Sequence, residues 1–317
     1  MKRSILTFFC CLTAVAAVSA APEPDAASAV SAAAPGTVFV QGEALKFRLS
    51  SSAVSAGGGV LRNWKDELLR RGDWPQGEER ELVLDALPNG YYKLELPGLA
   101  GFRSFAVVSD PAGRAPEGEL YFAMDSAQSW LARPDAGNPR QPENPYEVVS
   151  EVARRAGLQM VRERLNWAEV EAVPGRYDWL QYGTNAKLLS ERGVKVLGMY
   201  HHAPEWVRRK DGKLPVDLFG TYRFAKKAAE TFRGQMTAWE FWNEPDGGFA
   251  SESAWDFAAA QKAAYLGFKA GAPSVKVMQG GFCLHPLIPY YQTFFDNDAA
   301  GYFDILSFHT YRPVANY

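Results

Sequence analysis

Strand-like runs alternate with helical stretches along the C-terminal two thirds of the chain, and this alternation limits the possible folds most. Strands are expected at residues 120–124, 158–162, 194–200, 237–242, 275–279 and 303–308. Most of the helices between them end at a glycine, which is the usual residue just past a helix end; these are Gly157, Gly193, Gly234 and Gly271. Strict alternation requires parallel strands, so we expect an α/β fold.

Two architectures satisfy this alternation, a (β/α)8 TIM barrel and a doubly wound open sheet. The strands recur about every 30 to 45 residues, near the share of one unit in a barrel. A doubly wound sheet usually carries a glycine-rich phosphate turn after its first strand, and residues 124–127 (Met-Asp-Ser-Ala) contain no glycine. We therefore predict that residues 115–317 form an incomplete TIM barrel, with about six of the eight units.

Residues 37–110 have short runs typical of β-strands, and we predict a small all-β sandwich domain there. The turn Asn89-Gly90 between residues 82–84 and 91–96 is a strong hairpin signal. Residues 60–74 fit either a helix or a hairpin, and the possible turn at Lys65-Asp66 favours the hairpin. Residues 110–113 are the expected linker to the barrel. The β domain would serve either as packing support or as a carbohydrate-binding module.

The N-terminal residues resemble a targeting segment. Lys2 and Arg3 precede an apolar run that ends in small residues at 18–20, the layout of a cleaved signal peptide and too short a run to span a membrane comfortably. We predict residues 1–20 as the signal peptide of a secreted or periplasmic protein. Residues 21–36, rich in Ala, Pro and Ser, are expected to be a disordered leader.

Charge and cysteine content exclude several functions. The formal net charge is -2, so no basic field favours nucleic acid, and no later stretch is apolar enough for a membrane span. Removal of residues 1–20 leaves Cys283 as the one cysteine. We therefore expect no internal disulfide and no cysteine zinc site.

The stretch 239–246, Trp-Glu-Phe-Trp-Asn-Glu-Pro-Asp, is the most informative of the expected strands. Proline cannot donate to a sheet ladder, so Pro245 marks the strand end. Alternation would place Glu240, Trp242 and Glu244 on one face. Glu244 then lies where a strand passes into a loop, the position at which barrels carry their chemistry. The alternative interpretation is a surface carboxylate after a buried strand.

Residues 243–245, Asn-Glu-Pro, resemble the acid/base strand of retaining glycoside hydrolases that share the (β/α)8 barrel, the clan that includes families 5 and 39. The resemblance implies that Glu244 is the general acid/base and that Asn243 binds the sugar 2-hydroxyl. It also implies an oligo- or polysaccharide substrate, with no metal and no cofactor.

Residues at the ends of other expected strands also resemble this clan. Arg162 would hold the nucleophilic carboxylate ionised; the alternative is a barrel ion pair with Glu240. Residues 171–179 match the loop that follows in these enzymes. The resemblance also implies a set of residues that line the sugar site: His201, Trp206, His309 and Tyr311.

All four histidines follow expected strands, although the role of His285 is not assigned. Adjacent histidines on an extended chain point to opposite sides, so His201 and His202 are not expected to share one metal. His309 and Tyr311 are two positions apart, so their side chains are expected on the same face of the extended chain.

A retaining glycosidase uses two carboxylates about 5 to 5.5 Å apart, and the resemblance places the nucleophilic Glu at the end of strand seven. The sequence ends at Tyr317, just past the sixth expected strand. We therefore expect the nucleophile beyond Tyr317 and an inactive chain in its absence; Glu163, Glu205 and Asp246 are not assigned this role. The alternatives are a non-catalytic secreted carbohydrate-binding protein with a degenerate barrel and a secreted metal-dependent hydrolase built around the histidines.

Overall fold

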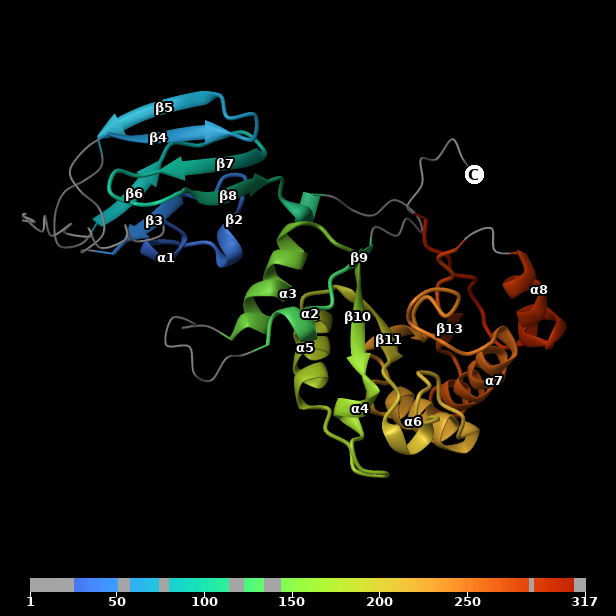
Figure 1. Ribbon diagram of the computed structural model, residues 1–317. Helices are drawn as coiled ribbons and strands as arrows, with labels where there is room; N and C mark the ends of the chain where they lie inside the picture. Colours follow the sequence, from blue (N-terminus) through green and yellow to red (C-terminus); the bar gives the residue numbers. More distant parts are fainter. Residues whose placement is uncertain are drawn as a thin grey trace, which may run out of the picture. The chain divides into compact units, whose positions relative to one another are not determined.

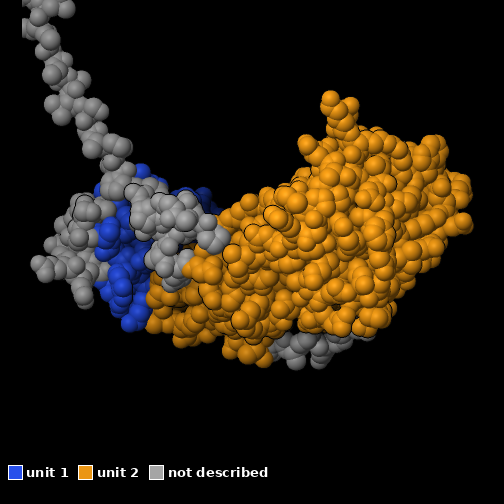
Figure 2. Space-filling model, turned by 90° about the horizontal axis from the view of Figure 1, so that it is seen from below, with its two compact units in different colours: residues 1–31, 46–84, 91–105 blue, residues 32–45, 85–90, 106–317 orange. Residues whose placement is uncertain are grey.

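The computed structural model describes residues 26–50, 58–73, 80–113, 123–133, 144–284 and 288–310. Its contacts divide the chain into two units (Figure 2), of which unit 1 comprises residues 1–31, 46–84 and 91–105 and unit 2 comprises residues 32–45, 85–90 and 106–317. The sequence suggested one change of domain, in the linker at 110–113. In the structure, residues 32–45 and 85–90 also belong to unit 2.

The β region contains two sheets (Figure 1). One has the order β1-β3-β6 and the other the order β2-β8-β7-β4-β5. The strands are β1 (Val30–Ala32), β2 (Val38–Val40), β3 (Leu45–Leu49), β4 (Gly58–Asn63), β5 (Leu68–Asp73), β6 (Arg80–Leu84), β7 (Gly90–Glu95) and β8 (Arg103–Val108). Phe47 of β3 packs edge-on against Phe105 of β8, with ring centroids 5.0 Å apart. This contact between the two sheets is part of the core of a small sandwich.

One of the two expected hairpins is confirmed and the other is wrong. β4 and β5 pair antiparallel around a turn in which Asp66 has a φ of 63°. The Asn89-Gly90 turn does not join paired strands, because β6 lies in one sheet and β7 in the other. A two-residue turn needs paired residues directly on both sides. Here residues 85–88 separate Leu84 from Asn89, and the chain uses them to change sheets.

The disordered leader expected over residues 21–36 is wrong for residues 26–36. These form α1 (Ala26–Ala29), β1 and the short helix η1 (Pro35–Thr37). Ala26 and Val30 are buried, because small apolar side chains fit against a sheet even in a segment of low complexity. The predicted signal peptide, residues 1–20, lies outside the described residues.

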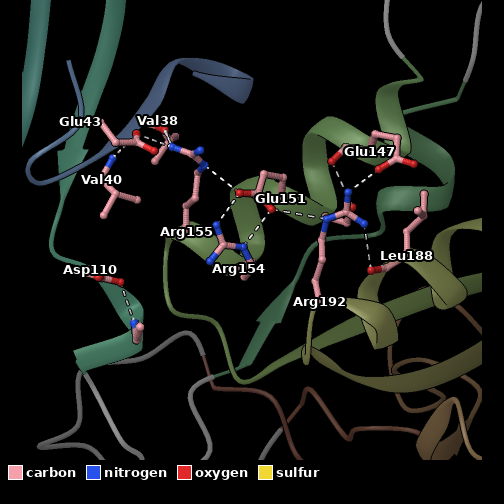
Figure 3. Close-up of polar contacts among 12 residues, drawn as sticks. Val38, Val40, Glu43, Asp110, Glu147, Glu151, Arg154, Arg155, Leu188 and Arg192 are labelled. Atoms are coloured by element: carbon pink, nitrogen blue, oxygen red, sulfur yellow. Dashed lines mark hydrogen bonds and ion pairs between the residues drawn. The ribbon is translucent and has the colours of Figure 1, made fainter. Parts of the chain in front are cut away.

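Residues 38–43 are held to helix α3 (Pro145–Arg155) within unit 2 (Figure 3). Arg155 donates from Nη1 to the carbonyl oxygen of Val38 (3.0 Å) and to Oε2 of Glu43 (2.6 Å). Its Nε donates to Oε1 of Glu151 (2.9 Å), which also binds Arg154. The hydrogen bond from Arg154, opposed by burial and reinforced by Arg155, lowers the pKa of Glu151 to about 2. These bonds explain why this segment of the β region clusters with the barrel unit.

The barrel sheet of unit 2 is parallel, with the order β13-β12-β11-β10-β9 (Figure 1). Its strands are β9 (Ala123–Asp125), β10 (Met160–Asn166), β11 (Lys195–His201), β12 (Met236–Phe241) and β13 (Lys276–Gln279). Spatial order therefore follows chain order without reversal. A doubly wound sheet reverses its order at a switch point, so the sheet is that of a barrel, as predicted.

Besides η1, the helices that the structure describes in unit 2 precede, separate or follow these strands in the chain. They are η2 (Pro111–Gly113), α2 (Gln128–Leu131), α3, α4 (Trp167–Val170), α5 (Leu180–Glu191), η3 (Glu205–Val207), α6 (Leu218–Thr231), α7 (Ala254–Gly271), α8 (Ile288–Asp296) and η4 (Ala299–Gly301). In the part of the chain that the structure describes, no helix is long and apolar enough to cross a membrane.

The sixth expected strand, residues 303–308, is not a continuous strand. It lies beside β13 through two isolated parallel bridges, Met278 with Ile305 and Phe282 with Phe308. The Gln279 side chain accepts from the backbone N–H of Ser307 (2.8 Å) and donates to its carbonyl oxygen. The Gln279 side chain thus makes the hydrogen bonds that, in a regular pair of strands, would join the two backbones.

Candidate active site at the carboxyl ends of the parallel strands

Glu244 is placed by an abrupt change of backbone conformation after β12. The strand ends at Phe241, and both Trp242 (φ 71°) and Glu244 (φ 45°) adopt left-handed conformations. The expectation that Glu240, Trp242 and Glu244 share one face is therefore wrong, because alternation applies only to extended chain. The Trp242 indole donates instead to the carbonyl oxygen of Phe249 (3.0 Å). Such strained non-glycine residues are concentrated at functional sites.

The Glu244 carboxylate meets His309, which comes from the sixth strand-like segment. Oε1 of Glu244 lies 2.7 Å from Nδ1 of His309, and both side chains are largely buried. The approach depends on Gly281, because a Cβ at that position would clash with Nε2 of His309. The structure thus brings together two residues that the sequence placed at separate strand ends. Tyr311, the expected partner of His309 on one face, lies outside the described residues.

Arg162 connects three strands through its guanidinium. Nε donates to Oε2 of Glu240 (2.6 Å), Nη1 to Oδ2 of Asp125 (2.9 Å) and Nη2 to Oδ1 of Asn243 (2.8 Å). The ion pair with Glu240, one of the two interpretations of Arg162, is therefore present. Asp125 was missed in the sequence, although a carboxylate that ends a barrel strand is a signal that could have identified it. Burial would raise the pKa of Asp125, but Arg164 and Arg162 lower it below its ordinary value.

Glu240 joins this arginine network to the Glu244–His309 pair. Its Oε1 accepts from the backbone N–H of Gly281 (2.9 Å), the residue against which the His309 ring lies. Glu240 is itself buried. The position of His309 beside Glu244 is therefore supported by the same buried carboxylate that binds Arg162.

His201 and His202 stack on each other at the end of β11, with ring centroids 4.0 Å apart. The expectation that they point to opposite sides is wrong, because His202 has a φ of 58° and leaves the extended conformation. The Trp130 ring lies 5.3 Å from His201. Burial, with the charges of His202, Arg164 and Arg162, lowers the pKa of His201 to about 2, so His201 is neutral. Among the described residues, no group of three or more His, Cys, Asp or Glu side chains could hold a metal.

A cavity of about 560 Å³ lies at the carboxyl ends of β10, β11 and β12. Its aromatic wall includes Trp242 and Phe249. Its polar lining is made by Asn166, His201, His202, Arg208 and Lys213. This volume is in the range of small-molecule sites.

Trp206 lies elsewhere in unit 2. Its indole Nε1 donates to the carbonyl oxygen of Glu171 (3.2 Å), and its ring packs edge-on against Trp167. Trp206 does not belong to the described lining of the cavity, and its role in sugar binding stays a prediction.

Glu163 follows Arg162 in the chain and points to the opposite side of the sheet, as alternation requires. It is fully buried. Oε1 accepts from the backbone N–H groups of Ser129 and Arg164 (both 3.1 Å), and Oε2 accepts from Nδ2 of Asn185 (2.5 Å). Burial, partly offset by these hydrogen bonds, raises the pKa of Glu163 to about 7.

Glu163→Gln is expected to stabilise the protein at alkaline pH. The folded-state pKa is raised, so ionisation of Glu163 makes folding less favourable as pH rises from about 4.5 to about 7. Glutamine mimics the neutral acid, and a flip of Asn185 would present its Oδ1 to the new amide. Urea unfolding should give similar stabilities at pH 4, whereas the variant should be more stable by about 3 kcal/mol at pH 8.

Glu191→Gln on helix α5 is the matched control, because the Glu191 carboxylate is exposed and its replacement should change the free energy of unfolding by less than about 0.5 kcal/mol. If the difference in free energy of unfolding between Glu163→Gln and wild type stays constant from acid to alkaline pH, the raised pKa of Glu163 is contradicted.

No family model and no curated protein matches the sequence. Among solved structures, the chain is similar to a family 39 glycoside hydrolase from the gut symbiont Bacteroides cellulosilyticus WH2, with 20% identity and a TM-score of 0.65. The match covers 86% of this chain and 56% of that one, so the chain spans little more than half of that protein's length. It is also similar to the catalytic domain of GH30 xylanase C from Talaromyces cellulolyticus, with 14% identity, a TM-score of 0.44, and coverage of 60% of this chain and 52% of that one.

The first of these likenesses shows the fold; the second has too low a TM-score to define it. The chain has the fold of the TIM-barrel glycoside hydrolases, with part of the barrel and an N-terminal β domain.

Proposed function

We propose that this chain belongs to a secreted glycoside hydrolase that cleaves O-glycosidic bonds with retention of configuration. Glu244 is the general acid/base of this proposal. The observation that carries it is the contact between Glu244 and His309, whose Oε1 and Nδ1 atoms are 2.7 Å apart at the carboxyl edge of a parallel barrel sheet. The substrate is an oligo- or polysaccharide.

General acid/base catalysis requires a carboxyl group that first protonates the leaving oxygen and later deprotonates water. His309 fixes the orientation of the Glu244 carboxylate, and the side chain keeps partial access to solvent. A group held in this way can move a proton along a defined direction, which is the geometric requirement for this role.

Asn243 supports a substrate-binding role in the same site. Its Oδ1 accepts from Nη2 of Arg162 (2.8 Å), and this bond fixes which way the amide faces. The two Nδ2 hydrogens then remain as donors. A sugar hydroxyl beside Glu244 is the ligand we assign to them.

The attacking carboxylate is assigned to none of the described residues. Glu163 is buried on the other side of the sheet. Asp246 accepts from the backbone N–H groups of Cys283 and Leu284, and the Glu205 side chain is 93% exposed. None of these three carboxylates is therefore placed for attack beside Glu244.

A non-catalytic saccharide-binding protein is the second candidate. Arg162, which the resemblance assigns to the nucleophile, already donates to Glu240, Asp125 and Asn243. This arrangement would also suit a barrel that binds saccharide without hydrolysing it.

A hydrolysis assay separates the two candidates. The product of the complete gene should release phenol from at least one member of a panel of aryl glycosides that covers the common pyranosides in both anomeric forms. Saccharide binding with no release from any member would favour the binding protein, and neither binding nor release would contradict both.

A further inference from the structure

We infer that the cavity at the carboxyl ends of β10, β11 and β12 binds an anionic group carried by the saccharide, either a carboxylate or a sulfate ester. The inference rests on the proposed function and adds a substrate class to it. Its starting point is the charge of the cavity. Arg208 and Lys213 contribute to the lining, and the described lining residues include no Asp or Glu.

The two cationic groups are held in place by carbonyl oxygens. Nζ of Lys213 donates to the carbonyl oxygen of Gly248 (2.5 Å), and Nη1 of Arg208 donates to that of Gly212 (2.7 Å). Both groups still have donors to offer, because an ammonium has three N–H donors and a guanidinium has five. The cavity therefore carries positive charge in fixed positions, which lowers the entropy cost of binding an anion.

Nearby carboxylates compensate this charge only weakly. Glu205 lies 3.5 Å from Nη2 of Arg208, but its side chain is 93% exposed, and exposed pairs of this kind contribute little. Glu252 accepts from the backbone N–H groups of Lys213 (2.6 Å) and Leu214 (3.0 Å) and is not among the lining residues. An anionic ligand would thus meet cations that are not already neutralised by a buried partner.

His201 supplies an uncharged polar group at the same cavity. Its side chain is 1% exposed, and Nε2 has no hydrogen-bond partner among the described residues. A buried polar atom without a partner is costly, so a ligand that bonds to Nε2 would be favoured. In the tautomer with a proton on Nε2, this neutral imidazole donates to an anion without adding charge.

The size and walls of the cavity indicate that the anion belongs to a sugar. A volume of about 560 Å³ exceeds what an isolated small anion needs. Phe249 is half-buried and offers aromatic surface, which packs well against the apolar face of a sugar ring, whereas Trp242 in the same wall is buried. An acidic or sulfated saccharide satisfies both the charge and the aromatic wall.

Calorimetric titration of the complete gene product tests this inference, in the Glu244→Gln background to prevent turnover. The probes are xylotetraose and cellotetraose as neutral ligands, aldotetrauronic acid and trigalacturonic acid as uronates, and a sulfated neocarratetraose. We expect at least one anionic probe to bind about tenfold or more tightly than the neutral ones, because hydrogen bonds to charged groups are the strong ones. This preference should weaken between about 50 and 500 mM salt.

Lys213→Gln should reduce affinity for the preferred anionic probe about tenfold and affinity for neutral probes less than about twofold. Lys213 is exposed, so the variant should fold, which circular dichroism can verify. Lys210→Gln is the matched control, because Lys210 is exposed and absent from the cavity lining. It should leave affinity for every probe unchanged.

The outcomes separate the inference from the proposed function. If neutral and anionic probes bind equally and Lys213→Gln changes neither, the anionic site is contradicted while saccharide binding stands. If no probe binds, the anionic site is contradicted, and the aryl glycoside assay decides the proposed function. Preference for the uronates identifies a carboxylate as the anion, and preference for the neocarratetraose identifies a sulfate ester.

Discussion

Glu244→Gln in the complete gene product is expected to lower kcat/KM by about 10²- to 10⁴-fold on glycosides with poor leaving groups. Glutamine keeps the shape of the side chain and an oxygen for the contact with His309, but it cannot donate a proton to the leaving oxygen. On dinitrophenyl glycosides, whose leaving group needs no protonation, loss of the acid should hardly affect bond cleavage. The measurement is the dependence of kcat/KM on the pKa of the leaving phenol, in wild type and variant.

Glu205→Gln is the matched control for this series, because the Glu205 side chain is 93% exposed. Its kinetics should follow those of wild type on all substrates. Equal losses in the Glu244 variant on good and poor leaving groups would exclude the acid role, since such losses would indicate damage to binding or folding.

Glu240→Leu is expected to lower the free energy of unfolding by about 3 to 5 kcal/mol. The Glu240 side chain is 1% exposed and that of Arg162 is 10% exposed. Removal of Glu240 leaves the buried guanidinium with Asp125, whose side chain is 39% exposed, as its remaining carboxylate partner. The backbone N–H of Gly281 also loses its acceptor. In urea unfolding, the loss of the ion pair and of this hydrogen bond should appear as a lower transition midpoint with a similar slope.

Two further variants, a control and a double variant, test the interpretation of Glu240→Leu. Glu230→Leu on helix α6 removes one partner of an exposed pair with Lys226, and it should change the free energy of unfolding by less than about 0.5 kcal/mol. The double variant Arg162→Met/Glu240→Leu should be more stable than Glu240→Leu alone, because it also removes the buried guanidinium that has lost its buried carboxylate partner. A cost below about 1 kcal/mol for Glu240→Leu would contradict the buried pair.

The barrel was predictable from the sequence because its signal repeats. Each strand and helix adds independent evidence, and glycines mark several helix ends at positions such as Gly193 and Gly271. The β4–β5 hairpin was predictable for a different reason, since its pairing depends only on the local turn at Asp66. Pairing between distant strands has no such local signal, and the wrong hairpin at Asn89-Gly90 shows the consequence.

The candidate site was predictable as a set of strand ends but not as a geometry. Glu244 and His309 are 65 positions apart in the chain, and their contact depends on the missing side chain of Gly281. Left-handed conformations at Trp242 and His202 overturned two expectations that assumed extended backbone. Predictions from the alternation of side chains therefore hold within the strands. They fail where the strands end, at the edge of the sheet that carries the site.

The most direct test of the proposed role is rescue by azide in the Glu244→Ala variant of the complete gene product. Azide needs no general base, so it can replace water in the second step of a retaining mechanism. With a dinitrophenyl glycoside, we predict that turnover rises with azide concentration and that the product is a glycosyl azide of the same anomeric configuration as the substrate. An active variant that hydrolyses this substrate at the wild-type rate and forms no glycosyl azide would contradict the assignment of Glu244 as the acid/base.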